Sequence, residues 1–110
     1  MTKAPTVAAA LVAGLWLLPA AAQTFPVGPD LWDRPRSAQA VQAAPGVRQA
    51  VDAALARPGA QLLIHHAAGQ EAQLQAEELR AWLMALALDS ARISLAADLR
   101  SRDNLVLEVR

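Results

Sequence analysis

The residues that could do chemistry are few, and most lie in the second half of the chain. His65 and His66 are adjacent, so on a strand their side chains point to opposite faces and cannot easily clamp one metal ion. Arg80 can pair with a carboxylate of a ligand or, more simply, with Glu77 three residues earlier on a helix flank. No complete nucleophile, metal-binding or phosphate-binding motif occurs, so we expect a protein that is not an enzyme and has no metal or cofactor.

A small hydrolase is the alternative from a different class. It would need a general base and a carboxylate in one cleft, and the chain offers His66 with either Asp98 or Glu71. Asp98 lies near an expected turn, where aspartate commonly bonds the local backbone. Loss of activity on His66→Ala would be the sign of such an enzyme.

The stretch that must position these groups covers residues 61–88. Residues 62–64 are apolar without alternation, which predicts a central strand covered on both faces. Gly69 supplies a turn, and a helix follows until residues 89–90. Residues 92–99 resume at strand spacing, which completes a βαβ unit. The apolar face of the helix comprises Ala72, Ala76, Leu79, Trp82, Leu83 and Leu86.

Three further segments complete the expected fold. Residues 37–42 have β or helical character and are interpreted as a short first strand. Pro45 suits the first turn of a helix, which Pro58-Gly59 ends. Residues 104–110 alternate and predict a last strand. The expected fold class is therefore α/β (α+β), with one small mixed sheet in β-α-β-α-β-β order and two helices packed on one face.

The N-terminus has the pattern of a secretory signal peptide. Lys3 precedes an apolar run over residues 7–18, and a small-x-small cleavage site follows at residues 20–22. A run of about 12 residues covers only about half of a bilayer core of about 30 Å. We therefore expect cleavage after Ala22, no membrane span afterwards, and a periplasmic location in a Gram-negative bacterium, with secretion as the alternative.

The composition of the chain limits the classes of partner that we expect. Ten basic and ten acidic residues balance, which gives no electrostatic footprint for nucleic acid or anionic lipid. There is no cysteine, so neither disulfides nor lipid attachment can contribute. Alanine supplies much of the apolar content and buries little area, so the core should be thin.

Residues 23–36 contain three prolines and predict an extended leader rather than a helix or strand. Phe25 and Trp32 stand out in this leader. One interpretation is that the leader folds back and covers part of the domain. The other is that these two side chains dock a partner protein of the envelope.

Residues 38–110 resemble a shortened OmpA-like C-terminal domain, the periplasmic module that binds peptidoglycan. The resemblance is carried by the runs PGAQLLIHH and ELRAWLMALALDSARISL and by the closing alternating strand. His66 matches the family histidine and Arg80-Ala81 the Arg-Ala pair, with Met84 and Leu88 at the next apolar positions. The resemblance implies peptidoglycan binding, with Arg80 as carboxylate partner and His66 shaping the turn.

The chain departs from the family pattern at the residues that hold the ligand. The family aspartate, which takes the ammonium group of the stem peptide, falls on Ala68, and the helix asparagine and serine fall on Gln73 and Glu77. Glu71 or Glu77 could replace the aspartate.

The expected organisation is a signal peptide at 1–22, a leader at 23–36 and one small domain at 37–110. The expected function is that of an exported, non-enzymatic binding or accessory module, with peptidoglycan or another envelope protein as partner. A protein-interaction module that uses a sheet edge or the Trp32 leader is the alternative.

Overall fold

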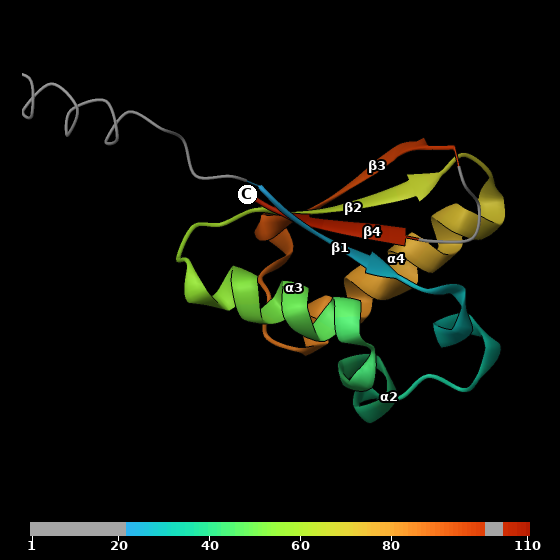
Figure 1. The fold of residues 1–110 in the computed structure, drawn as a ribbon, viewed down its shortest axis with the longest axis horizontal. Helices are drawn as coiled ribbons and strands as arrows, with labels where there is room; N and C mark the ends of the chain where they lie inside the picture. Colours follow the sequence, from blue (N-terminus) through green and yellow to red (C-terminus); the bar gives the residue numbers. More distant parts are fainter. Residues whose placement is uncertain (1–21, 101–104) are drawn as a thin grey trace, which may run out of the picture.

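The computed structural model describes residues 22–100 and 105–110. The expected signal peptide, apart from its last residue, and the expected turn at 101–103 lie outside the described residues. Figure 1 shows one sheet with the helices gathered on one side of it. No helix in the described ranges combines the length and the apolar character needed to cross a bilayer.

The sheet has four strands in the order β1-β4-β2-β3. Their bounds are Gln23–Val27 for β1, Leu62–Ala67 for β2, Ile93–Leu99 for β3 and Leu105–Val109 for β4. The strand β4 is antiparallel to both of its neighbours, β1 and β2. The strands β2 and β3 are parallel and are joined through helix α4 (Gln70–Ala85), so the predicted βαβ unit is confirmed. The predicted mixed α/β class is likewise confirmed.

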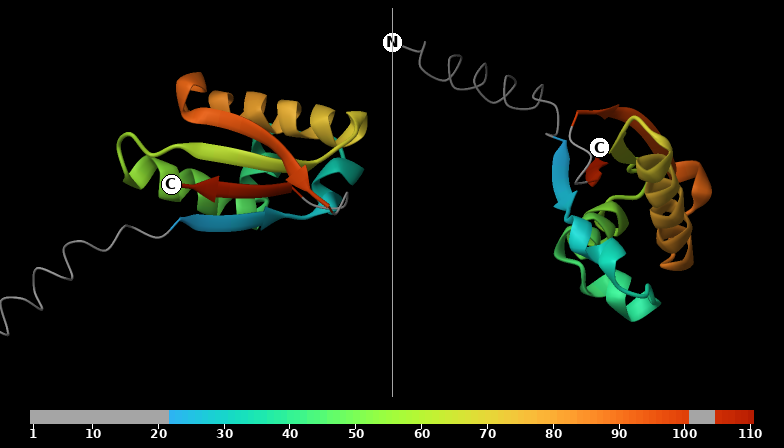
Figure 2. Two further views of the ribbon diagram at one scale, coloured as in Figure 1. Left: turned by 90° about the horizontal axis from the view of Figure 1, so that it is seen from above. Right: turned by 90° about the vertical axis from the view of Figure 1, so that its right-hand side faces the viewer.

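Two helices cover one face of the sheet (Figure 2). Helix α3 (Pro45–Ala56) packs on β1 and β4, and α4 packs on β2 and β3. Burial alternates along the inner strands, as it must when one face is covered. The largest buried side chains are Leu62, Ile64, Leu79, Leu83, Leu105 and Leu107. Each contributes roughly 1.5–3 kcal/mol by leaving water. The apolar face expected for α4 is confirmed, since Ala72, Ala76, Leu79 and Leu83 are buried.

The expectation that β2 is covered on both faces was wrong. Leu63 and His65 are only partly buried, because they point to the face that no helix covers. The expected end of α4 at residues 89–90 was also late. The helix ends at Ala85 because Ala87 adopts a left-handed backbone with φ of 95°, and the N–H of Leu88 donates to the carbonyl of Leu83.

The first strand was predicted in the wrong place. Residues 38–43 form helix α2 (Ala38–Ala43), because the hydroxyl of Ser37 accepts a hydrogen bond from the Ala40 N–H and caps it. The strand β1 lies instead in the expected leader, followed by the 3-10 helix η1 (Pro29–Asp33). Pro26 is tolerated because β1 is an edge strand. The leader is therefore part of the fold.

Helix α3 meets β1 at Gly46. A Cβ added at this position would clash with the backbone carbonyl oxygen of Pro26, and Gly46 is buried. Only glycine allows the helix to approach the strand this closely. The contact holds an edge strand that pairs with a single neighbour.

We predict that Gly46→Ala destabilises the protein. Overpacking costs about 1–3 kcal/mol, and alanine returns about 1 kcal/mol of helix propensity, so we expect a net loss of up to about 2 kcal/mol in the unfolding free energy from urea titration. Gly28→Ala is the matched control, because its Cβ would meet only the side-chain carboxylate of Asp30, at 2.8 Å. Equal unfolding midpoints for the two variants would contradict the close approach.

Candidate ligand-binding site

A hollow of about 440 Å³ lies between the leader and the start of α4. Pro29, Trp32 and Asp33 of the leader line one side, and residues 68–72 with Gln75 line the other. The second side is the turn that follows β2. Ligands of α/β sheets commonly bind at the carboxyl ends of strands, and this hollow has that position on the central strand β2.

An ion pair fixes the leader against α4. The Nε and Nη2 atoms of Arg36 donate to the two carboxylate oxygens of Glu78 at 2.7 and 3.0 Å. The indole Nε1 of Trp82 also donates to Glu78, at 3.1 Å. The Arg36 guanidinium lies 5.3 Å from the centre of the Trp32 ring. Trp32 is thereby held in place at the rim of the hollow.

The Arg36 hydrogen bonds stabilise the charged form of Glu78 and so lower the pKa of its carboxyl group, against the opposing effect of burial. Because this carboxyl pKa is lower in the folded state than in the unfolded state, the ion pair stabilises the fold at any pH above the unfolded-state pKa. The stabilisation is lost as the pH falls through the folded-state pKa. The Arg36–Glu78 ion pair therefore contributes fully to holding the leader at neutral pH, and this contribution declines only in acid.

The hollow combines two carboxylates with an aromatic ring. Asp33 and Glu71 are both exposed. Within residues 22–100 and 105–110, neither has a hydrogen bond or ion pair to another side chain. Such groups can receive the ammonium group of a ligand, and the Trp32 ring can support a flat sugar face. Gly69, with φ of 118°, allows the turn that brings Glu71 to this place.

Two of the residues predicted from the sequence come together here. Trp32 was assigned to partner binding and Glu71 to ligand binding, and both line the hollow. Asp33 and Gln75 were missed as site residues. Helix spacing could have identified Gln75, since it lies one turn after Glu71.

The other predicted site residues lie elsewhere. His66 is buried at 5% exposure, and its Nδ1 donates to the carbonyl of Ala67 at 2.8 Å. Arg80 is nine residues after Glu71, half a turn away around α4, and does not line this hollow. Glu77 is exposed and accepts from Gln73 at 3.4 Å, without the expected ion pair to Arg80 among the described residues. Phe25 packs partly buried on the core.

A second polar cluster lies on the uncovered face of the sheet. His65 on β2 donates from Nδ1 to Asp98 on β3 and from Nε2 to Glu108 on β4, each at 2.8 Å. The hydrolase pairing of Asp98 with His66 was therefore wrong, because Asp98 contacts the other histidine and His66 lies on the opposite face. The opposite orientation of the two histidines had been predicted. Among the described residues no cluster of His, Cys, Asp and Glu is arranged to hold a metal ion.

The two carboxylates decide the charge of His65. Burial alone would lower the pKa of the imidazole, but the hydrogen bonds to Glu108 and Asp98 outweigh it, so the pKa is raised. Both ring nitrogens donate, which requires the imidazolium form. The stabilisation is fully present below the unfolded pKa of about 6.5 and is lost as the pH rises through the folded value.

We predict that His65→Gln removes this pH dependence. The free energy of unfolding of the wild type should fall as the pH rises above about 6.5, and the variant should show a flatter profile in urea titrations over the same range. Asp98→Asn and Glu108→Gln should each flatten the profile in part. An unchanged slope in His65→Gln would show that a group other than His65 causes the pH dependence.

Comparisons with known proteins do not assign the chain to a family. A scan against protein-family models and a search of the curated proteins both find no match for the chain. The hollow and the residues that line it are therefore the basis for inferring the function.

Proposed function

We propose that the chain is an exported, non-enzymatic binding module of the bacterial cell envelope, and that its ligand occupies the hollow between the leader and α4. The proposal is carried by one observation: Trp32, Asp33 and Glu71 line the same hollow at the carboxyl end of the central strand. The N-terminal signal-peptide pattern supports export.

The chemistry of the lining favours peptidoglycan as the ligand. Its stem peptides carry ammonium groups, which suit Asp33 and Glu71, and its glycan strands carry sugar rings, which suit Trp32. In this proposal Glu71 takes the role that the OmpA-like family gives to the aspartate at the position of Ala68. The mixed sheet with helices on one face is consistent with that resemblance.

The family route through Arg80 is the weaker version of the proposal. Arg80 lies on the side of α4 away from Glu71, Gln75 and Glu78, which face the leader. A ligand in the hollow would therefore meet the carboxylates of Asp33 on the leader and Glu71 on α4 rather than this guanidinium.

We predict that Glu71→Gln and Asp33→Asn weaken retention on purified peptidoglycan in a sedimentation assay. Each change removes a charged acceptor for an ammonium group, so the double variant should bind about tenfold or more weakly. Glu77→Gln is the matched control, because it makes the same change on the same helix outside the hollow.

Arg80→Ala separates the two routes. Normal retention by this variant and poor retention by Glu71→Gln would support the hollow. The reverse pattern would place the ligand on the other side of α4, and no retention of the wild type would remove the cell-wall ligand.

A further inference from the structure

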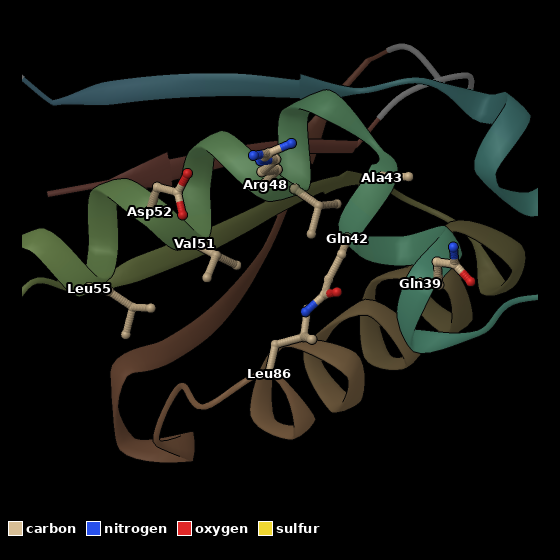
Figure 3. Close-up of a pocket in the computed structure, with 9 residues that line it drawn as sticks. Gln39, Gln42, Ala43, Arg48, Val51, Asp52, Leu55 and Leu86 are labelled. Carbon is tan, nitrogen blue, oxygen red and sulfur yellow. The ribbon is translucent and has the colours of Figure 1, made fainter.

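The outer face of α3 carries four exposed side chains at a regular spacing. Pro45, Arg48, Asp52 and Leu55 follow one another at intervals of three, four and three residues, and Leu55 is 50% exposed. These are the intervals at which helix residues face a second helix in a coiled-coil seam. Figure 3 shows Arg48, Asp52 and Leu55 on α3. They line a hollow of about 510 Å³ that extends to Leu86, the residue after α4.

The two charges on this face do not pair with each other. Arg48 and Asp52 are one helical turn apart, a spacing at which opposite charges often form an ion pair. The ion pairs among the described residues are Arg36–Glu78, His65 with Asp98 and Glu108, and Arg110–Glu108. A cation and an anion thus remain side by side on an exposed surface.

The four residues are self-complementary in an antiparallel pair of helices. When two copies of a helix pack antiparallel about a two-fold axis, residues equally far from the centre on opposite sides face each other. With the centre at Ala50, Arg48 faces Asp52 of the second copy, and Pro45 faces Leu55 of the second copy. This antiparallel packing therefore forms two Arg48–Asp52 ion pairs and two Pro45–Leu55 apolar contacts between the copies.

We infer that α3 is the contact helix of a homodimer, in which the second copy packs antiparallel on Pro45, Arg48, Asp52 and Leu55. A different partner would need no self-complementary order of residues, whereas a second copy requires one. The helix has 12 residues and is about 18 Å long. An interface of this size belongs to the weak, reversible class.

The test uses charge-reversal variants of the full chain as purified from the producing cell. Sedimentation velocity over a range of protein concentrations measures the dimerisation of each variant. Arg48→Asp places two aspartates opposite each other in both contacts, and Asp52→Arg places two arginines there. Each variant alone should dimerise about tenfold or more weakly than the wild type, because both ion pairs become repulsive.

Mixing is the decisive step. In an equimolar mixture of Arg48→Asp with Asp52→Arg, a mixed dimer in the same register has an aspartate opposite an arginine in both contacts. The mixture should therefore associate clearly better than either variant alone. The double variant R48D/D52R restores both cation–anion contacts within one sequence. It should form dimers over the same range of protein concentration as the wild type. All four positions are exposed, and circular dichroism checks that each variant is folded.

Three results would overturn the inference: a wild type that stays monomeric at every concentration, single variants that dimerise like the wild type, or a double variant that stays monomeric. Leu55→Asp supplies an independent check and should weaken the dimer without any change in the ion pairs. None of these outcomes depends on peptidoglycan binding, because α3 contributes nothing to the hollow at the start of α4.

Discussion

The helices α3 and α4 pack against the same face of the sheet, and this one-sided packing decides where polar groups can gather. On the covered face the strands present leucine, isoleucine and valine, with His66 the one buried polar side chain among the described residues. On the other face His65, Asp98 and Glu108 can reach one another across three strands. The open face is thus joined by hydrogen bonds rather than by a second apolar layer.

The same constraint explains why the leader belongs to the fold. A thin core with one covered face gains from every added apolar contact, and the leader supplies Val27 and Leu31, which are only 2% and 6% exposed. Gly46 lets α3 approach β1, and Arg36 attaches the end of the leader to Glu78 on α4. The side of α4 that holds the leader through Glu78 also contributes Glu71 and Gln75 to the hollow, so the anchor and the candidate site share one face of one helix.

The sequence predicted the central strand β2, the helix α4 and the fold class, because these depend on long apolar patterns that local periodicity reveals. It missed β1, because proline-rich edge strands lack the alternation of inner strands and depend on a tertiary contact at Gly46. It placed Glu71 and Trp32 in separate sites, since nothing local indicates that the leader returns to the start of α4. The cluster around His65 depends on the register of three strands, and a single sequence does not contain that register.

The two ionic clusters limit stability from opposite sides of the pH scale. Glu78 has a lowered pKa, so its ion pair with Arg36 is lost as the pH falls through the folded value. His65 has a raised pKa, so its ion pairs with Asp98 and Glu108 are lost as the pH rises through the folded value. The contributions of both clusters are therefore present together between these two titrations. In a domain with a thin core and no cysteine, both ion-pair clusters therefore add to the apolar packing and strand pairing within one window of pH.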